Sequence, residues 1–419
     1  MPLSRDDRGD ALLGGVSLAS VLERADVTTP FYAYDVDGIV LSARQLSAAF
    51  APHDALVCYA VKANTAGRIV RRLAAEGVGA DVVSGGELAV ALGAGVPASR
   101  VVWSGVAKTD DELDRALSAS LLSVHVESIE ELARLSARAR ASGRTARVSL
   151  RLNPGVEADT HAHIATGHDE AKFGIPMADL GAALDAARAP GLSLVGVSSH
   201  VGSQMTTTDA YVDAARGLAA AARTAIAGGA PLELIDLGGG MGIDYGDGCA
   251  AAPADFARAG AKVVRDAGLT HLRILCEPGR ALVGAHGVLV ARVIQTKRWR
   301  RPDTVGWTFL DAGMNDLVRP AMYGARHRIE PLGAASSKLA RWRVAGPVCE
   351  SSDDFGTFDL PDPPPPAVVI RDAGAYGFAM ASQYNGRALS TEVFIEDGAV
   401  SSVAPGTSVD AWIAARLAT

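Results

Sequence analysis

Short apolar runs alternate with alanine-rich segments between about residues 55 and 280 of the chain. The segments between the runs repeat apolar residues at three- and four-residue spacing, which indicates amphipathic helices, and glycine often follows them in the position of a helix C-cap. The runs themselves have the length and composition of buried strands. The eight predicted strands lie at residues 56–61, 80–84, 101–105, 121–126, 146–152, 192–200, 232–240 and 271–279.

Eight strands that alternate with helices predict a parallel (β/α)8 barrel. An open, doubly wound parallel sheet is the alternative, because periodicity alone does not show whether a sheet closes.

The pattern changes after residue 280. Strand-like segments separated by glycine, proline and aspartate predict a second, β-rich domain, with one helical pattern near the C-terminal end. Residues 29–40 are typical of a strand followed by a helix and fit either domain. We predict a barrel domain at 37–280 and a β-rich domain built from 1–36 and 281–419.

Composition excludes several classes of protein. The chain has 419 residues, 48% of them hydrophobic, which is ample for a large core. The net charge of −7 disfavours a nucleic-acid or anionic-membrane binder, and the basic run at 296–301 is a local exception typical of a solvated loop or hairpin. No run reaches the ~18 apolar residues of a membrane span, and the acidic N-terminal segment does not resemble a signal peptide. We therefore expect a cytoplasmic protein.

The four cysteines predict free thiols in a reducing compartment. They show neither CxxC spacing nor histidines at metal-ligand spacing, so we predict no metal site. They are Cys58, Cys249, Cys276 and Cys349.

Polar residues follow the predicted strands at the ends that meet at one edge of a barrel, where barrel enzymes build their active sites. A random scatter of polar residues would not gather there. In strand order these residues are Lys62, Ser84, Arg151, Asn153, His200, Gly238, Gly239, Gly240, Glu277 and Arg280.

The glycine runs "LGGGMGI" and "EPGR" follow the seventh and eighth strands. Glycines let the backbone approach a ligand and point several N–H groups at it, and barrels often bind phosphate in these two loops. A plain tight turn is the alternative for either run alone.

Lys62 is one of only six lysines and directly follows the first strand, while Lys172 is the one other lysine near the predicted edge. Desolvation lowers the pKa of an amine, and a neutral lysine can form a Schiff base with an aldehyde. A Schiff-base lysine beside a phosphate loop indicates pyridoxal 5'-phosphate. The alternative is a lysine paired with a carboxylate.

Glu277 suits the same cofactor. A pyridoxal ring withdraws electrons most strongly when its nitrogen is protonated, and a nearby carboxylate favours that form. A cationic partner would suit racemisation better than decarboxylation. His200 could stack on the ring, or it could be a hydrogen-bonded histidine at a strand end.

The sequence closely resembles the diaminopimelate decarboxylases, which share the alanine-racemase-like fold of pyridoxal-phosphate enzymes. The motifs cover most of the chain in order. They are "YAVKAN" (59–64), "ADVVSGGEL" (80–88), "RLNPGV" (151–156), "TGHDEAKFGI" (166–175), "SHVGSQ" (199–204), "DLGGGMGI" (236–243), "CEPGR" (276–280), "DAGMNDLVRPAMYGARH" (311–327), "GPVCESSD" (346–353) and "DAGAYGFAMASQYN" (372–385).

The resemblance implies roles for individual residues. Lys62 would carry the cofactor, His200 would stack on its ring and take part in catalysis, and Glu277 would face the ring nitrogen. The other implied cofactor-binding residues are Asp81, Gly238, Gly239, Gly240, Gly279, Arg280 and Tyr376.

The resemblance also implies a substrate site. Arg280, Arg319 and Tyr323 would bind substrate carboxylates, and Tyr376 would lie near both substrate and cofactor. Glu350 would receive the distal amino group.

Cys349 would be the acid that reprotonates the α-carbon. In this family Cys349 and Glu350 come from the partner subunit, so the resemblance implies a homodimer with shared active sites.

The implied reaction is decarboxylation of meso-2,6-diaminopimelate to L-lysine and CO2, the final step of lysine biosynthesis. Ser352, Gln383 and the missing proline after Arg387 depart from the family's motifs and leave a related amino acid as an alternative substrate. An amino-acid racemase is a third hypothesis, and a non-catalytic relative that binds the cofactor is a fourth.

Overall fold

The computed structural model describes the chain except residues 1–2, 157–171, 249, 300–303, 335–337 and 419. Cys249 and parts of the predicted motif at 166–175 and of the basic run at 296–301 therefore lie outside the described residues. The chain divides into two compact units. A barrel unit comprises residues 40–243 and 249–282, and a β-rich unit comprises residues 1–39, 244–248 and 283–419.

The barrel unit contains a closed parallel sheet. Each strand pairs in parallel with the next in the barrel, and the circle closes because β13 pairs with β5 and β8 pairs with β9. The predicted barrel is confirmed, and the open sheet is wrong. The barrel strands are β5 (Ala55–Ala60), β6 (Gly79–Val82), β7 (Val101–Trp103), β8 (Ser123–Val126), β9 (Ala146–Asn153), β11 (Leu192–Ser198), β12 (Leu234–Asp236) and β13 (Arg273–Cys276).

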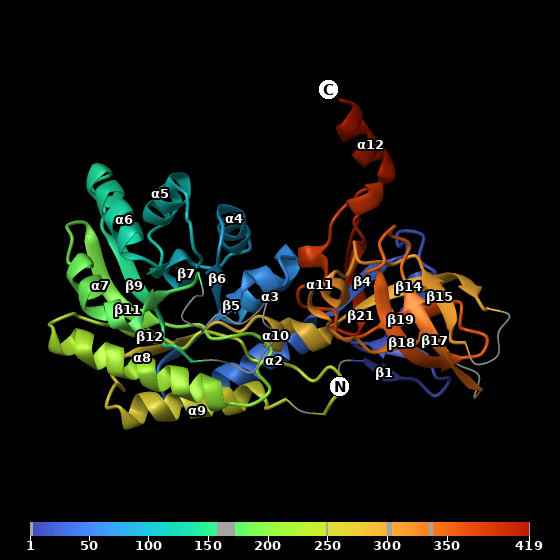
Figure 1. Ribbon diagram of the computed structural model, residues 1–419, viewed down its shortest axis with the longest axis horizontal. Coiled ribbons are helices and arrows are strands. Elements are labelled where there is room, and N and C mark those ends of the chain that lie inside the picture. The colour runs from blue at the N-terminus through green and yellow to red at the C-terminus, as the bar shows by residue number, and fades with distance from the viewer. Residues whose placement is uncertain (1–2, 157–171, 249, 300–303, 335–337, 419) are drawn as a thin grey trace. The chain divides into compact units, whose positions relative to one another are not determined.

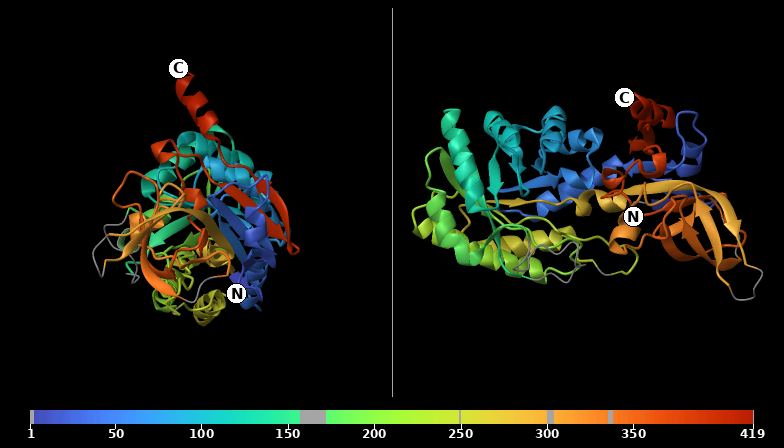
Figure 2. Two further views of the ribbon diagram at one scale, coloured as in Figure 1. Left: turned by 90° about the vertical axis from the view of Figure 1, so that its right-hand side faces the viewer. Right: turned by 45° about the horizontal axis from the view of Figure 1, so that its top comes forward.

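Helices lie around the outside of these strands in both Figure 1 and Figure 2. Two of them begin at a side-chain cap, Ser84 or Ser128, two residues after a strand, which fixes the start of the helix at the carboxyl edge of the barrel. The helices that follow β5 to β12 are α3 (Gly67–Ala75), α4 (Gly85–Gly93), α5 (Asp110–Ala119), α6 (Ile129–Ala141), α7 (Leu180–Ala186), α8 (Asp209–Ala227) and α9 (Pro253–Asp266).

Shorter elements complete this unit. A two-residue strand, β10 (Ile175–Pro176), pairs in parallel with β9. Apolar side chains from five strands form part of the barrel core. These are Leu56, Cys58, Val102, Val195, Leu234 and Leu275. The 3-10 helices are η1 (Val61–Ala63), η2 (Ala98–Arg100) and η3 (Met177–Asp179), and α2 (Val36–Ala49) leads into β5.

The β-rich unit is built on a sheet in the order β18-β17-β15-β14-β4-β20-β21, with β19 joined to β14 and β16. The predicted strands after residue 280 are confirmed, whereas β16 and β18 were not predicted. The strands are β4 (Phe31–Asp35), β14 (Gly287–Lys297), β15 (Gly306–Leu310), β16 (Ile329–Pro331), β17 (Leu339–Ala345), β18 (Asp354–Pro361), β19 (Ala367–Ile370), β20 (Thr391–Glu396) and β21 (Ala399–Ala404).

The N-terminal segment adds a small antiparallel sheet of β1 (Leu3–Arg5), β2 (Ala11–Leu13) and β3 (Val16–Ser17) to this unit. Its buried residues Leu3, Leu13 and Leu18 share one apolar core with Phe31, Val290 and Val393 of the larger sheet. The unit's helices are α1 (Leu18–Leu22), α10 (Arg280–Val283, which begins in the barrel unit), α11 (Arg319–Tyr323) and α12 (Val409–Leu417), with η4 (Gly284–His286), η5 (Phe378–Met380) and η6 (Tyr384–Gly386).

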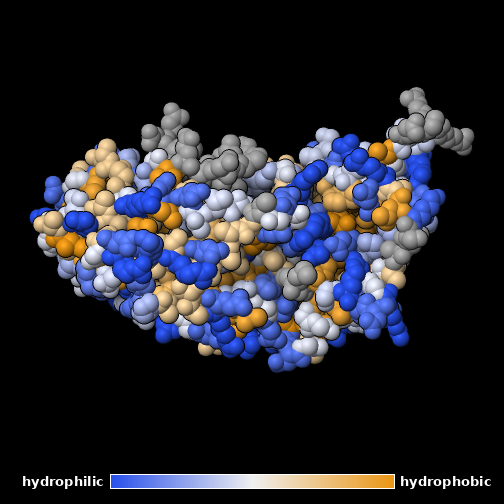
Figure 3. Space-filling view, turned by 90° about the horizontal axis from the view of Figure 1, so that it is seen from below, coloured by the Kyte–Doolittle hydropathy of each residue, from blue (hydrophilic) through white to orange (hydrophobic). Residues whose placement is uncertain are grey.

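On the face shown in Figure 3, hydrophilic residues are interspersed with small apolar patches. Within the described part of the chain, no helix combines the length and apolar character needed to cross a membrane.

Candidate active site

Lys62 lies in η1, two residues beyond the end of β5, whereas the sequence predicted that it directly follows the strand. Its Nζ is 2.5 Å from Oδ2 of Asp81, a fully buried residue of β6, and the Lys62 side chain is 31% exposed. The lysine–carboxylate pair is therefore real. It does not exclude a reactive amine, because a partly accessible amine held at the barrel edge can still meet an aldehyde.

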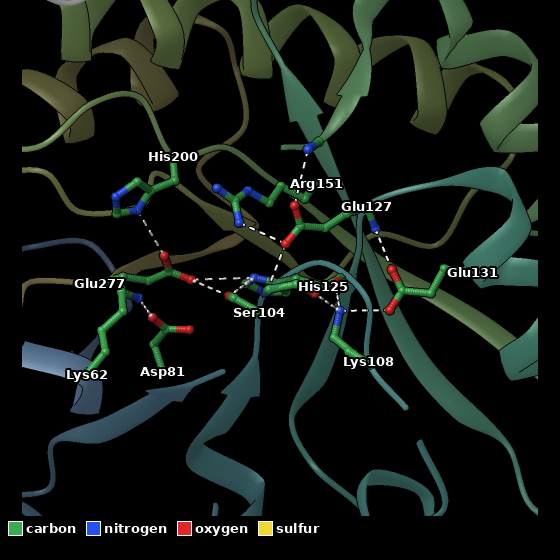
Figure 4. A network of polar contacts seen from close by, with 12 residues as sticks. Lys62, Asp81, Ser104, Lys108, His125, Glu127, Glu131, Arg151, His200 and Glu277 are labelled. Atoms are coloured by element: carbon green, nitrogen blue, oxygen red, sulfur yellow. Dashed lines mark hydrogen bonds and ion pairs between the residues drawn. The ribbon is translucent and has the colours of Figure 1, made fainter. Parts of the chain in front are cut away.

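Glu277 follows β13 and is 4% exposed. One carboxylate oxygen is 3.3 Å from Ser104 Oγ and 3.4 Å from His125 Nδ1, and the other is 3.4 Å from His200 Nδ1 (Figure 4). Burial alone would raise the pKa of Glu277, but its contacts with the histidines, that with His125 foremost, prevail and hold the pKa well below the usual value. The structure therefore keeps a negative charge at this buried position.

Asp236, at the end of β12, behaves in the opposite way. Burial and then the charge of Glu277 raise its pKa well above the usual value. Oδ2 of Asp236 is 3.7 Å from Nε2 of His125. One side-chain atom each of His125, Asp236 and Glu277 lies within 4.8 Å of the others, so a single histidine stands between two acids whose pKa values shift in opposite directions.

The glycine loop after β12 leaves no room for side chains. A Cβ on Gly238 would lie 2.2 Å from the carbonyl oxygen of Ser199, and one on Gly239 would lie 2.0 Å from that of Glu277. Gly238 and Gly240 also have φ values of +70° and +86°, which glycine adopts without strain. Residues 238–240, here called the cradle, are thus a stretch of backbone without side chains that packs tightly against the backbone of Ser199 and Glu277.

Arg280 and Ser203 supply polar groups beside this loop. Arg280, buried at the start of α10, donates from Nη2 to Ser203 Oγ at 2.9 Å. A guanidinium, a hydroxyl and the N–H groups of a glycine loop are the donors that bind phosphate in proteins. Ser203 was not predicted, although it lies inside the recognised motif at 199–204.

A second buried network of polar side chains lies at the carboxyl ends of β7, β8 and β9. Lys108 Nζ donates to Glu131 and to the carbonyl oxygens of Gly105 and His125, each at 2.7 Å. Arg151 Nη1 is 2.8 Å from Glu127 Oε1 (Figure 4). No local sequence pattern predicts that Lys108 is buried.

Other residues predicted at the edge have structural contacts. Ser84 accepts from the Glu87 N–H and caps α4, and Asn153 accepts from the Gly155 N–H at 3.0 Å. Lys172 is exposed, with its amine 5.1 Å from the ring centroid of Phe173. Lys62 is the better placed of the two candidate lysines.

Arg319 and Tyr323 begin and end α11 in the β-rich unit. Arg319 is buried, its Nη1 is 2.8 Å from Nε2 of His327, and its guanidinium lies over the ring of Tyr245 at 4.9 Å. Tyr323 is half-buried. Arg319 is therefore a cation fixed in direction.

Tyr376 has φ of +56°, a conformation rare for a residue with a side chain and often found at functional sites. Cys349 and Glu350 are exposed. Asn385 Oδ1 accepts from the Cys349 N–H at 2.9 Å, and the Tyr384 hydroxyl donates to Glu350 at 2.5 Å.

The thiols differ in character. Burial raises the pKa of Cys58 and Cys276 well above that of an ordinary thiol, whereas Cys349 is exposed. Among the described cysteines, Cys349 is therefore the one accessible to a substrate.

The predicted residues thus fall into two groups, each within one unit. The barrel unit brings together Lys62, Asp81, His200, Gly238–Gly240, Glu277, Gly279 and Arg280. The β-rich unit carries Arg319, Tyr323, Cys349, Glu350 and Tyr376.

Comparison with known proteins identifies the class. The family model described as "Pyridoxal-dependent decarboxylase, pyridoxal binding domain" matches residues 36–284. The diaminopimelate decarboxylase of Neisseria meningitidis serogroup A is 40% identical over 370 residues, covering 88% of this chain and 90% of the relative. That of Aquifex aeolicus is 36% identical over 400 residues, covering 94% and 93%.

Solved structures agree. A crystal structure of diaminopimelate decarboxylase from Helicobacter pylori with L-lysine has a TM-score of 0.87 at 36% identity, covering 94% of this chain and 98% of that one. The corresponding enzyme from M. jannaschii with L-lysine has a TM-score of 0.91 at 31% identity, covering 99% and 97%. The chain belongs to the pyridoxal-dependent decarboxylases, in the family of diaminopimelate decarboxylases.

Proposed function

We propose that the chain is a pyridoxal-phosphate-dependent carboxy-lyase that converts meso-2,6-diaminopimelate to L-lysine and CO2. The observation that carries this proposal is the meeting of Lys62, the glycine loop and an ionised, buried Glu277 at one edge of the barrel. Curated relatives at 36–40% identity over about nine tenths of the chain bear the name of this activity.

The residues of the barrel edge fit the cofactor. Lys62 would hold its aldehyde carbon, the cradle of Gly238–Gly240 with Arg280 and Ser203 would hold its phosphate, and Glu277 would face its ring nitrogen. The fit rests on the bare backbone of the glycine loop, whose close packing against the Glu277 carbonyl excludes a Cβ at Gly239, and on the donors beside the loop. When bound, the cofactor withdraws the electron pair that the departing CO2 leaves on the α-carbon.

Protein side chains supply the rest of the chemistry. The Glu277 carboxylate holds a proton at the ring nitrogen by charge attraction. Arg319, held by His327, offers a fixed guanidinium to a substrate carboxylate, and Glu350 offers an acceptor to the distal ammonium group. The Cys349 thiol would deliver a proton to the α-carbon after CO2 has left. Tyr323 and Tyr376 would complete the substrate site.

We further propose that the enzyme is a homodimer in which Cys349 and Glu350 serve the site of the partner subunit. The exposure of both side chains in the single chain supports this arrangement. A cytoplasmic location would keep the exposed thiol reduced.

The test is incubation of the protein with pyridoxal phosphate and meso-diaminopimelate, with lysine and CO2 measured together. The Lys62→Ala variant should lose both products and the visible absorbance of the bound cofactor. Lys262→Ala is the matched control, because Lys262 is exposed on α9 and pairs with Asp266. Its activity should equal that of the unmodified chain.

Each other outcome has a defined meaning. A bound cofactor without lysine would refute the substrate, and CO2 from another amino acid would favour the related decarboxylase. Racemisation without CO2 would favour the racemase. Cofactor absorbance that persists in Lys62→Ala would refute the assignment of the lysine.

A further inference from the structure

His125 has no part in the proposed chemistry, yet it lies at the centre of the site's buried charges. It belongs to β8 and is 1% exposed. Its ring stands between the carboxyls of Glu277 and Asp236, with Ser104 beside it. Figure 4 shows its contacts with Glu277 and Ser104. A buried imidazole between two acids needs an explanation, because burial of each of these groups is costly unless its charge or hydrogen bonds are satisfied.

The contacts of His125 are directed mainly at Glu277. Nδ1 is 3.4 Å from Glu277 Oε1 and 3.1 Å from Ser104 Oγ, and Ser104 in turn donates to the same carboxylate oxygen at 3.3 Å. A proton on Nδ1 therefore supports the Glu277 carboxylate directly or through the hydroxyl. Nε2 faces Asp236 at 3.7 Å, which is beyond ordinary hydrogen-bond length.

His200 cannot replace this contribution in the observed geometry. The backbone N–H of Gly239 donates to Nδ1 of His200 at 3.2 Å, so this nitrogen acts as an acceptor. The same nitrogen is the one that lies 3.4 Å from Glu277 Oε2. An imidazole nitrogen that accepts a hydrogen bond has no proton to donate, so the two contacts exclude each other. His125 and Ser104 remain as the donors on this side of the carboxylate.

We infer that His125 is a positioning residue, which keeps Glu277 ionised and oriented so that the carboxylate can hold a proton at the cofactor's ring nitrogen. This inference rests on the proposed function. Without a donor at this place, two buried acids would face each other, and burial together with the neighbouring charge would raise the pKa of Glu277 as they raise that of Asp236. A neutral Glu277 would no longer favour a protonated ring.

Two substitutions distinguish the effect of the His125 hydrogen-bond donor from the effect of the space that its ring fills. His125→Leu fills the space and removes the donor. His125→Asn places its amide nitrogen near the position of Nδ1 and keeps a donor toward Glu277, while losing the group that faces Asp236. Thermal unfolding of both holoenzymes shows whether either variant has lost the fold.

The first readout is independent of turnover. The proteins are reconstituted with pyridoxal phosphate labelled with 15N in the ring, and the nitrogen chemical shift reports whether the ring nitrogen is protonated. We expect a protonated nitrogen in the unmodified chain and in His125→Asn. We expect a shift toward the unprotonated form in His125→Leu and in Glu277→Gln.

The second readout is kinetic. We expect His125→Leu to lower kcat by about tenfold or more with KM within about twofold, and His125→Asn to stay within about threefold of the unmodified enzyme. In a Glu277→Gln background His125→Leu should cause almost no further loss, because its effect passes through Glu277.

The inference is overturned if His125→Leu, folded and loaded, keeps a protonated ring nitrogen. It is also overturned if His125→Leu costs the same factor in both backgrounds, as a general packing defect would. Failure of the unmodified enzyme to release CO2 from diaminopimelate refutes the proposed function instead, and the nitrogen shift still decides the role of His125.

Discussion

At the scale of single residues, the site depends on positions where only one type of residue fits. Gly239 is the clearest case, because a methyl group there would overlap the carbonyl oxygen of Glu277. That carbonyl belongs to the residue whose carboxylate is proposed to face the cofactor. The space available at Gly239 and the position of the Glu277 carboxylate are therefore coupled through this one contact.

Gly239→Ala should consequently lose cofactor affinity and about 1–3 kcal/mol of stability, since the backbone of the two loops must separate. Gly181→Ala is the matched control, because Gly181 is exposed in α7 and a Cβ there meets no atom within 4 Å. The control should be neutral or up to about 1 kcal/mol more stable, as helix propensity favours alanine. Urea unfolding and cofactor titration measure both effects. Equal losses of stability and of cofactor affinity in the two variants would contradict the proposed role of Gly239.

Glu392, on β20, predicts a dependence of stability on pH. Burial raises its pKa from an ordinary 4.5 to about 7, although the Tyr34 hydroxyl that donates to it at 2.9 Å opposes the rise. The folded chain thus binds this proton more tightly than the unfolded chain does. The resulting stabilisation is full below pH 4.5 and is lost as the pH rises through 7.

Glu392→Gln should remove this dependence, because glutamine can still accept from Tyr34 but does not ionise. Between pH 5.5 and 8 the unmodified chain should lose about 2 kcal/mol more of its unfolding free energy than the variant loses. Urea unfolding of the two proteins at both pH values measures the difference, in which groups common to both chains cancel. An identical change in both chains would show that Glu392 titrates normally.

Sequence patterns identified the polar residues that directly follow strands. They missed a polar residue of the site that lies inside a strand. Lys62 and Glu277 follow apolar runs and were predicted. His125 occupies an inward position of the strand "SVHV", and no local pattern tells an inward histidine at the barrel's centre from an ordinary polar strand residue. Its closeness to Glu277 arises only when the barrel closes. The polar alternation Ser123–His125 was the one available signal.

At the scale of elements, the loops at the carboxyl edge serve both the site and the helices that follow. The loop after β7 contains buried Lys108 and then Thr109, which forms a capping box with Glu112 at the start of α5. Each half of the box satisfies an N–H group that the first turn of a helix leaves unpaired. The same few residues thus fix the loop and begin the helix.

Thr109→Ala should therefore cost about 1 kcal/mol of stability, because the Glu112 N–H loses its acceptor. Thr208→Ala is the control. Thr208 holds the same position before α8, but its side chain makes no capping hydrogen bond, so its loss should be near zero. Chemical denaturation compares the two. A similar cost in both would mean that threonine acts there through backbone preference and not through the cap.

Elements were predictable where periodicity was long and regular. Apolar runs in the sequence coincide with all eight barrel strands and with β14, β15, β17, β19, β20 and β21. The strand β18 was missed because its sequence, "DFGTFDLP", mixes glycine, acids and a final proline, which are typical of turns. Its strand form depends on pairing along β17, and that pairing is not a local property.

At the scale of the whole molecule, each compact unit is assembled from segments far apart in the chain. Residues 244–248, which follow β12 of the barrel, belong to the β-rich unit, and Tyr245 there lies under the Arg319 guanidinium. No local pattern in the sequence indicates that residues 244–248 belong to the β-rich unit. The proposed reaction requires residues of both units, and this requirement makes subunit mixing informative.

Lys62→Ala and Cys349→Ala each remove one side of the proposed shared site. In a symmetric dimer with sites made from two chains, a mixed dimer has one site with both substitutions and one with neither. Random exchange of equal amounts yields mixed dimers as half of the population, so about a quarter of the sites should be intact. We expect the mixture to recover about a quarter of the unmodified activity after exchange, while each variant alone stays near its own low rate. Size-exclusion chromatography with differently tagged chains verifies that exchange has occurred. Mixed dimers without recovered activity would show that Lys62 and Cys349 act within one chain.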